Sequence, residues 1–459
     1  MKNRGRMNPY HMAYNGITSG LFLALFPPFW IYSRMSGRYR NGMSERFGHY
    51  PENLRRRGDS APRIWIHAAS VGEVSVAFSI LNVLQDLVPG CRLILSTITE
   101  HGRRYAENRI VGTSLKARTT CVFAPIDLVL TTRRALATLQ PDVLACVETE
   151  LWPNWLMEAG RMGIKTALVN GRISIRSIDR YMKIRPLMQD LLARMDAFSM
   201  IRETDARRIS LMGAPADRIE IHGNAKFDIP TESLDSEKDR MRTLYGISDK
   251  TPVFIAGSIR GEEDAMVLSA YARIVREVPK TVLILAPRHI ERVRHIAQRV
   301  RAQGFSCQLR TELIGDGFPR RAQVVILDTI GELQSVYGIA DVVFCGGSLV
   351  PTGGQNVLEA AVWGKPVLYG PSMEDFLDAK EILDQTGGGV QVKDIDELAG
   401  KALDLLKHPD QARVMGCLAS QALALNRGAA RRHADVIRNL LSKNGRKRRS
   451  GGVSPLAKG

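Results

Sequence analysis

Glutamates stand at the ends of two predicted strands, where a carboxylate can act as a general base. Glu73 follows the apolar run 63–68 and the small residues Ser70 and Gly72, where a helix is expected to begin. An acid at a helix start is often structural, because the helix dipole stabilises it by ~0.3–1 kcal/mol. The dipole also lowers its pKa, so a base at Glu73 needs burial or neighbouring carboxylates to restore basicity.

Glu148 and Glu150 lie in the stretch ETELWPNW (148–155), which ends another predicted strand. In an extended chain, alternate side chains project from the same side. The two carboxylates repel unless a Lys or Arg lies between them or a polyhydroxylated ligand binds them. Such repulsion would also raise the pKa of Glu73. Trp152 and Trp155 fit either a sugar or lipid pocket or the core.

Two cationic residues follow later strands of the same half. Arg172 lies in NGRIS (170–174) and Lys226 in GNAKFD (223–228). Lys226 is expected near a domain junction, where it can contact a phosphate or a carboxylate across a cleft.

A glycine-rich segment in the second half, residues 346–371, combines a strand end with an expected helix over 355–363. Gly353 and Gly354 allow the backbone to approach a ligand closely, and a helix N-terminus favours phosphate. Gln355 and Asn356 open this helix. Glu359, one turn further, can accept hydrogen bonds from ribose hydroxyls. The structural alternative is a glycine-rich turn followed by an ordinary surface glutamate.

Other strand ends of this half also indicate a ligand that contains phosphate. A strand-end arginine such as Arg288 is a good phosphate clamp, because its planar guanidinium pairs with two oxygens. His289 fits a structural hydrogen bonder more readily than a general base. The candidate residues at these strand ends are Ser258, Glu262, Pro287, Arg288, His289 and Gly331.

The elements that position these residues form two series of strands alternating with helices. The first series is expected at 63–68, 91–97, 119–124, 142–148, 165–169, 197–201 and 218–222. The second is expected at 251–258, 281–287, 324–328, 341–348, 365–370 and 389–392. This alternation predicts an α/β fold with parallel sheets, whose ligands lie beyond the carboxyl ends of the strands.

The chain of 459 residues is too long for one typical core, so two doubly wound domains facing a central cleft are expected. We assign 61–229 to the first Rossmann-like domain, 230–250 to a linker and 251–430 to the second Rossmann-like domain. Residues 1–60 form an N-terminal membrane-associating segment, and 431–459 form the C-terminal helix end and a basic tail.

The net charge of +17 indicates an anionic partner: nucleic acid, a nucleotide or an acidic membrane surface. The apolar stretch 17–32, broken by Pro27 and Pro28 and flanked by arginines, fits a membrane anchor or monotopic insertion. The alternative is an apolar arm packed on the protein. None of the six cysteines forms a CxxC pair, which argues against a disulfide framework or metal cluster and favours a reducing compartment.

Taken together, these motifs resemble the Kdo transferases, glycosyltransferase family 30, which have the GT-B fold. The matching stretches run in family order over about residues 20–430. They are HAASVGEV (67–74), ETELWPN (148–154), NGRIS (170–174), GNAKFD (223–228), APRH (286–289), DTIGEL (328–333) and GGSLVPTGGQNVLEAAVWGKPVLYGP (346–371).

The resemblance implies transfer of 3-deoxy-D-manno-octulosonic acid (Kdo) from CMP-Kdo to a lipid A precursor, lipid IVA, with inversion at the anomeric carbon. Glu73 would be the general base, and the acceptor would contact Ser70, Gly72, Glu148, Glu150 and Arg172. The donor would contact Lys226, Ser258, Glu262, Pro287, Arg288, His289, Gly331, Gly353, Gly354, Gln355, Asn356 and Glu359. The family needs no metal or other cofactor, binds no nucleic acid and works at the cytoplasmic side of the inner membrane.

One departure concerns the donor site. Gln355 stands where a histidine is common in the family; it keeps hydrogen bonding but cannot carry positive charge. We expect altered donor contacts rather than lost activity. Two other classes stay open: another nucleotide-sugar enzyme, either a UDP-sugar transferase or an epimerase, and a catalytically silent sugar-nucleotide binding protein.

Overall fold

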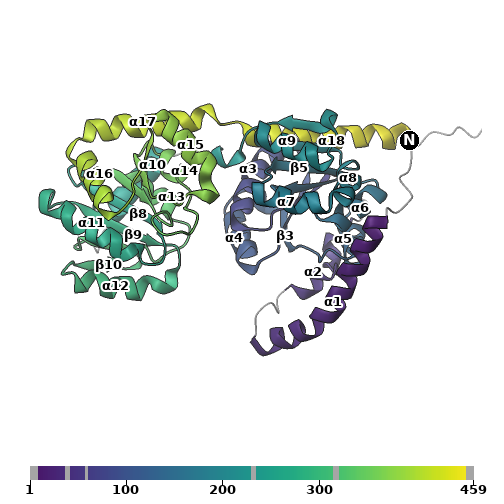
Figure 1. The fold of residues 1–459 in the computed structure, drawn as a ribbon, viewed down its shortest axis with the longest axis horizontal. Helices are drawn as coiled ribbons and strands as arrows, with labels where there is room; N and C mark the ends of the chain where they lie inside the picture. The colour runs from purple at the N-terminus through teal and green to yellow at the C-terminus, as the bar shows by residue number, and fades with distance from the viewer. Residues whose placement is uncertain (1–8, 37–41, 57–59, 229–233, 314–319, 451–459) are drawn as a thin grey trace, which may run out of the picture. The chain divides into compact units, whose positions relative to one another are not determined.

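The computed structural model describes residues 9–36, 42–56, 60–228, 234–313 and 320–450 (Figure 1). The chain divides into two compact units, Met1–Asp228 with Arg427–Gly459, and Ile229–Asn426. The segment 230–250, expected to be a linker, contains helix α10 (Leu234–Leu244) of the second unit. Residues 427–430, placed in the second domain from the sequence, belong to the first unit.

The first unit contains a seven-stranded parallel sheet in the order β3-β2-β1-β4-β5-β6-β7. All seven strands predicted for this half are present. Because the strand order reverses between β1 and β4, the loops after these two strands flank the topological switch point. The strands are β1 (Arg63–His67), β2 (Arg92–Thr97), β3 (Thr119–Phe123), β4 (Val143–Val147), β5 (Lys165–Gly171), β6 (Ala197–Met200) and β7 (Ile219–Ile221).

Helices cover both faces of this sheet, which explains why β1 and β4 are buried along their whole length. One face packs against α5 (Val129–Leu139), α6 (Pro153–Arg161), α8 (Arg185–Leu192) and α9 (Glu203–Met212). The other face packs against α3 (Val71–Leu87), α4 (Glu100–Ile110) and α18 (Ala429–Ser450). Short helices α2 (Met43–Arg46) and α7 (Ile175–Lys183) complete the unit.

The C-terminal part of the chain forms two helices, α17 (Pro409–Leu425) and α18. Gly428 between them has a φ of +87°, and its N–H and that of Ala430 donate to the Asp228 carboxylate over 2.5 Å each. Asp228 thus caps the start of α18. Ile437 and Leu440 of α18 then join the core of the first unit.

The second unit contains another seven-stranded parallel sheet, in the order β10-β11-β9-β8-β12-β13-β14. Its strands are β8 (Val253–Ile259), β9 (Val282–Pro287), β10 (Cys307–Leu309), β11 (Val324–Ile326), β12 (Val342–Cys345), β13 (Val367–Tyr369) and β14 (Gly389–Gln391). The sequence analysis missed only β10, a three-residue edge strand that is half-buried and carries no apolar run.

Helices α11 (Glu263–Glu277), α12 (Val293–Ala302) and α16 (Ile395–Lys407) pack on the second sheet through Leu268, Ile296 and Leu398. The remaining helices are α13 (Leu333–Val336), α14 (Leu358–Ala361) and α15 (Leu377–Thr386). The helix expected over 355–363 is therefore shorter than predicted. It begins after Asn356, whose Oδ1 accepts the Leu358 N–H at 3.2 Å.

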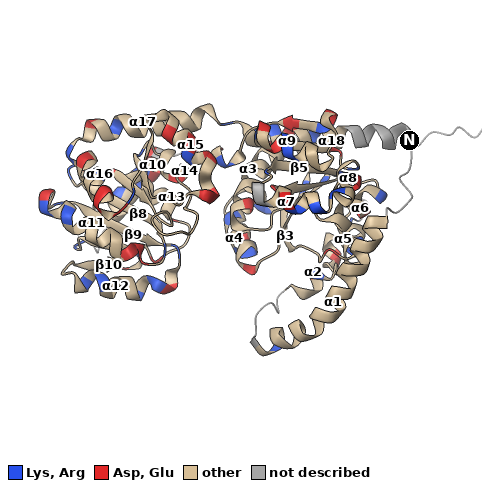
Figure 2. Cartoon of the chain, viewed as in Figure 1, with Lys and Arg blue, Asp and Glu red and all other residues tan. Residues whose placement is uncertain are grey.

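The N-terminal apolar segment is a single helix, α1 (Pro9–Ser36), that runs through Pro27 and Pro28 rather than being broken there. A proline removes only its own N–H from the helix ladder, so hydrogen bonds on either side can persist. Residues Pro9–Met35 are long and apolar enough to cross a membrane, with a mean hydropathy of 1.2. Figure 2 shows α1 almost without charge, Arg34 being its one Lys, Arg, Asp or Glu.

One side of α1 docks on the first unit. His11 Nε2 lies 2.9 Å from Asn154 Oδ1, and the Tyr14 hydroxyl donates to Asp127 Oδ2 at 2.7 Å. Phe26 packs edge-on against Phe47 with ring centroids 5.3 Å apart. The other side exposes large apolar residues, including Ile17, Leu21, Leu23, Leu25, Phe29 and Trp30. The helix thus combines an arm packed on the protein with an apolar face that a membrane can cover.

Candidate active site

Glu73 is held in the first turn of α3 by reciprocal hydrogen bonds with the turn that follows β1. The Ser70 hydroxyl accepts the Glu73 N–H at 3.4 Å and donates to Glu73 Oε1 at 2.9 Å. The Ala69 N–H donates to Oε2 at 2.9 Å. The Ser70 side chain thus caps the start of α3, and the structural role expected for a helix-start acid is present. Both carboxylate oxygens are fixed in position.

The same carboxylate is unusually basic. The pKa of Glu73 is raised to about 7, mainly by burial and in addition by the negative charges of Glu148 and Glu150. The hydrogen bonds from Ala69 and Ser70 act in the opposite direction. A pKa near neutrality is the value that favours a general base. The structural hydrogen bonds of Glu73 therefore coexist with a base-like environment.

Glu148 stands at the end of β4 in a left-handed conformation, with a φ of +57°, which is uncommon for a residue with a side chain. Its N–H donates to the Val169 carbonyl at 3.1 Å. Its Oε1 lies 2.8 Å from Lys226 Nζ. Strained backbone of this kind collects at functional sites, where the surrounding structure maintains it.

Lys226 belongs to the first unit and joins the predicted acceptor residues rather than the predicted donor residues. It lies on a short 3-10 turn, Ala225–Phe227, that the Asn170 side chain fixes by accepting the Ala225 N–H at 2.8 Å. Asn170 itself has a φ of +50°. Lys226 thus supplies a cation beside Glu148, one of the two acids expected to need one.

Glu150 has different partners. Its Oε2 accepts the Trp152 indole N–H at 2.7 Å and lies 3.4 Å from His67 Nε2. Burial alone would raise the pKa of Glu150, but His67 and Trp152 together hold it below its usual range. His67 is oriented in turn by Ser96, whose hydroxyl lies 2.9 Å from His67 Nδ1. Neighbouring acids with different environments can divide their roles, one charged and one basic.

The other predicted acceptor residues lie at the same sheet edge. Ser70 caps α3, Gly72 is exposed in its first turn, and Arg172 follows β5. Arg172 forms no ion pair with any residue in the described ranges. Because β1, β4 and β5 are adjacent parallel strands, their carboxyl ends meet at one edge.

His67 and Asn170 are the positioning residues that sequence reasoning missed. His67 could have been recognised from the sequence, because it is a polar residue at the end of the buried strand RIWIH. Trp155 is core: it is 1% exposed and packs against the rings of Trp65 and His67. Trp152, half-buried and bonded to Glu150, is the tryptophan that belongs to the acid cluster.

In the second unit, the predicted donor residues lie after β8, β9 and β11 and in the loop after β12. These four strands are neighbours in the sheet. Ser258 has a φ of +54° at an irregularity of β8. Pro287 is half-buried, whereas Arg288 and His289 are exposed after β9; the Arg288 N–H donates to the Ile259 carbonyl at 3.0 Å. Gly331, exposed after β11, has a φ of +92°.

Glu263, rather than its neighbour Glu262, organises the glycine-rich loop. The Glu263 side chain is fully buried, and its carboxylate accepts the N–H groups of Gly347, Ser348 and Leu349 over 2.5, 2.9 and 2.9 Å. The Arg260 N–H adds a fourth bond of 2.8 Å. Glu262 is exposed and pairs with Arg299 at 2.8 Å. Glu262, predicted as a donor contact, therefore lies on the surface beside Glu263, whose role in the loop was not predicted from the sequence.

The loop after β12 depends on glycine at two consecutive positions. Gly353 and Gly354 have φ values of +85° and +77°. A Cβ at Gly354 would meet Met373 Sδ and lie 2.9 Å from Ser372 O. The Gly353 N–H donates to Ser372 Oγ at 2.9 Å.

The residues after these glycines are Gln355, which is buried, and Asn356, whose amide donates to Glu359 Oε1 at 3.2 Å. Because α14 has only four residues, it does not provide the longer helix whose N-terminus was expected to favour phosphate.

The comparisons with known proteins agree with this arrangement. Residues 41–229 match the family described as 3-Deoxy-D-manno-octulosonic-acid transferase (kdotransferase). A 3-deoxy-D-manno-octulosonic acid transferase of Haemophilus influenzae is 30% identical over 90% of this chain and 95% of its own length. One of Bordetella pertussis is 30% identical over 93% and 99%. The chain belongs to the Kdo transferase family.

The protein is therefore a glycosyltransferase that transfers Kdo in lipopolysaccharide biosynthesis. Among solved structures, UDP-GlcNAc 2-epimerase from Neisseria meningitidis bound to UDP-GlcNAc aligns with a TM-score of 0.56, covering 83% of this chain and all of that one. The sequence identity is only 12%, so this likeness shows the fold alone. The prediction of a GT-B type α/β fold is confirmed.

Proposed function

We propose that this Kdo transferase moves Kdo from CMP-Kdo to the lipid A precursor lipid IVA, with Glu73 as the general base. The observation that supports this role is the environment of Glu73: a carboxylate with a pKa raised to about 7, fixed by Ser70 and Ala69 at a sheet edge that also carries Glu148 and Glu150. At neutral pH a large fraction of such a group is free to accept a proton.

The proposed reaction is a single displacement. Glu73 removes the proton of an acceptor hydroxyl while the hydroxyl oxygen forms a bond to the anomeric carbon of Kdo. The bond from that carbon to the phosphate oxygen breaks, and CMP leaves with the electron pair. Attack opposite the leaving group inverts the anomeric configuration.

The other acids and Arg172 are proposed to hold the acceptor. Glu150, kept ionised by His67 and Trp152, can accept hydrogen bonds from sugar hydroxyls. Arg172, which has no ion-pair partner in the described part of the chain, can bind an acceptor phosphate.

The donor is proposed to bind at the carboxyl edge of the second sheet, on the loop that Glu263 holds. Backbone N–H groups of a glycine-rich loop and the guanidinium of Arg288 suit a phosphate. Glu359, bonded to Asn356, suits ribose hydroxyls. No group of three or more His, Cys, Asp or Glu side chains in the described residues could hold a metal ion, and a monophosphate donor does not call for one.

The exposed apolar face of α1 is proposed to lie in the inner membrane, with both units on the cytoplasmic side. The net charge of +17 favours an anionic lipid surface and a phosphorylated acceptor. A chain lacking residues 1–36 should lose flotation with anionic lipid vesicles.

The deciding experiment incubates the purified protein with CMP-Kdo and lipid IVA and identifies the product by mass spectrometry. Glu73→Gln should lower kcat by ~10²–10⁴-fold while leaving CMP-Kdo binding intact. Glu203→Gln, which changes an exposed first-turn glutamate of α9 paired with Arg207, is the matched control. Near-normal turnover by Glu73→Gln would remove Glu73 as the base. Tighter binding of a UDP-sugar than of CMP-Kdo would favour another nucleotide-sugar enzyme.

A further inference from the structure

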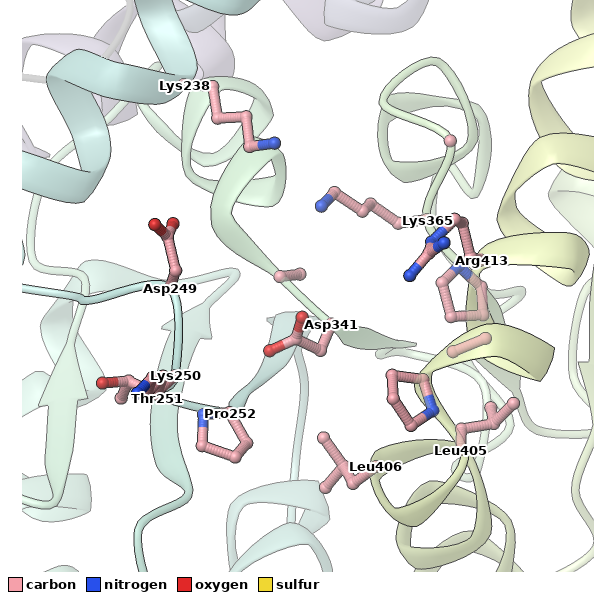
Figure 3. A pocket seen from close by; sticks show the side chains of 15 residues that line it. Lys238, Asp249, Lys250, Thr251, Pro252, Asp341, Lys365, Leu405, Leu406 and Arg413 are labelled. Carbon is pink, nitrogen blue, oxygen red and sulfur yellow. The ribbon is translucent and has the colours of Figure 1, made fainter.

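A pocket lies in the second unit, at the edge of the sheet opposite the one that carries the proposed donor loop. Figure 3 shows the side chains that line this pocket. Its volume is about 470 Å³, within the range of small-molecule sites. Pro252, Asp341 and Pro366, which line it, immediately precede β8, β12 and β13. Ligands of the main site lie beyond the carboxyl ends of strands, so this pocket at the amino ends is a separate feature. We call it the basic pocket.

Its lining carries more positive than negative charge. Lys238 comes from α10, Lys250 precedes β8, Lys365 precedes β13 and Arg413 comes from the first turns of α17. In Figure 3 the side chains of Lys238 and Lys365 extend into the same open space.

The acidic residues of the lining have other partners. Asp249 pairs with Arg242 at 2.9 Å, and Asp341 Oδ2 accepts the Val253 N–H at 2.8 Å. Within the described ranges, Lys238, Lys250 and Lys365 form no ion pair with a carboxylate. Asp341 offsets part of the charge of Lys365, but four cations face two carboxylates in the lining, so the pocket keeps an excess of positive charge.

Lys365 shows the electrostatic consequence. The pKa of Lys365 is lowered to about 8, mainly by burial and in addition by the positive charges of Lys238 and Arg242, while the carboxylate of Asp341 opposes this lowering. Bringing half-buried like charges together is unfavourable, and a bound anion would relieve it. The start of α17, which has no side-chain cap, adds a positive helix end beside Arg413.

The rest of the lining is apolar, with Leu405 and Leu406 from the end of α16 and the proline Pro409. We propose that the basic pocket binds a small phosphorylated metabolite, with its phosphate between Lys238 and Lys365 and its less polar part against Leu405 and Leu406. Two lysines from different elements match the double charge of a phosphate monoester, for which lysine is a common partner. The apolar wall favours an organic phosphate over inorganic phosphate.

Phenyl phosphate is a suitable probe, because it joins a phosphate dianion to an apolar ring. We would titrate it, and inorganic phosphate in parallel, into the full-length protein by calorimetry at constant ionic strength. The proposal expects phenyl phosphate to bind more tightly than inorganic phosphate. Lys238→Met/Lys365→Met should weaken phenyl phosphate binding by ~10-fold or more.

One control separates the basic pocket from other surface lysines. Lys401→Met changes an exposed lysine of α16 outside the lining and should bind phenyl phosphate as the wild type does. Single Lys238→Gln and Lys365→Gln variants, checked by thermal unfolding, should each give a partial loss of binding in folded protein. Unchanged binding in the double variant, an equal loss in Lys401→Met, or no binding by the wild type would overturn the proposal.

Discussion

The Nζ atom of Lys226 lies 2.8 Å from Oε1 of Glu148. This ion pair joins the last turn before the second unit to the strand end that carries the acid cluster. It also limits how much Glu148 raises the pKa of Glu73, because a cation beside Glu148 offsets its negative charge. Lys226 is therefore a positioning residue that affects the pKa of the proposed base indirectly, through Glu148.

Replacement of Lys226 should move the acid limb of the pH–rate profile. The rate of the wild type should fall as pH decreases through about 7, where Glu73 takes up a proton. In Lys226→Met the uncompensated charge of Glu148 raises the pKa of Glu73, so the limb should shift to higher pH by ~0.5–1 unit. The measurement is kcat for Kdo transfer between pH 5.5 and ~9.

Lys116→Met, which changes an exposed lysine of the same unit, should keep the wild-type profile. A Lys226→Met profile with an unmoved acid limb would contradict the electrostatic role of the ion pair, even if the variant were slow.

Glu73 should reduce stability at the pH where it works. Its folded pKa, about 7, lies above the value of 4.5 expected for an unfolded chain. The folded state thus favours the protonated form, and stability falls as pH rises from about 4.5 through 7. Glu73→Gln should unfold at a higher temperature than wild type at pH 8, with little difference at pH 4.5. Equal melting temperatures at pH 8 would show that the carboxylate is not strained there.

The repeated strands were predictable because parallel strands buried on both faces read as continuous apolar runs, as in Val143–Val147. Glu73 was recognisable because the strand-to-helix turn is local in sequence. Its basicity was not, because it depends on burial and on the charge of Glu148, which is distant in the chain and approaches Glu73 only through the folding of the sheet.

Glu262 and Glu263 show a second limit of prediction from the sequence. Both follow the same strand, and their types give no reason to prefer either one. Because the two residues are adjacent at the start of a helix, their side chains point in different directions: Glu263 is buried in the core and Glu262 is exposed to solvent. The return of the chain to the first unit at 426–428 was not predictable either, because the composition of α18 does not indicate which unit the helix packs on.

This adjacent pair gives a matched test of the donor loop. Glu263→Gln leaves a buried side chain with one acceptor for four backbone N–H groups, so it should lower stability by about 3 kcal/mol or more. The KM for CMP-Kdo should rise at least ~10-fold as the loop loosens. Glu262→Gln should change neither the melting temperature nor KM detectably, because exposed ion pairs contribute little. Equal effects of the two changes would contradict the assignment of Glu263 as the loop's anchor.

Gly354→Ala should impair donor binding more than folding. A Cβ at this position has to adopt a φ of +77° and displace Met373 or the backbone at Ser372. We expect the KM for CMP-Kdo to rise while kcat at saturation changes less, measured by steady-state kinetics. Gly400→Ala, inside α16 with open space around it, should instead stabilise the protein by up to ~1 kcal/mol. A wild-type KM in Gly354→Ala would remove the glycine loop from the donor site.

The docking of α1 can be tested at Tyr14. Burial raises the pKa of Asp127 to about 6, and the hydrogen bonds from Tyr14 and from the N–H groups of Asn154 and Trp155 oppose this. Tyr14→Phe removes one donor from a carboxylate that is charged above pH 6. The variant should therefore lose about 1.5–3 kcal/mol of stability at pH 8 and less at pH 5, where Asp127 is largely protonated.

Thermal unfolding in detergent at the two pH values measures this difference. Tyr32→Phe, on the exposed side of the same helix, is the control and should leave the melting temperature unchanged. Asn154 and Trp155 follow Glu150 closely in the chain, so loosening α1 should also lower the rate of Kdo transfer. A Tyr14→Phe variant with equal losses at both pH values would show that the hydroxyl acts by packing and not through the charge of Asp127.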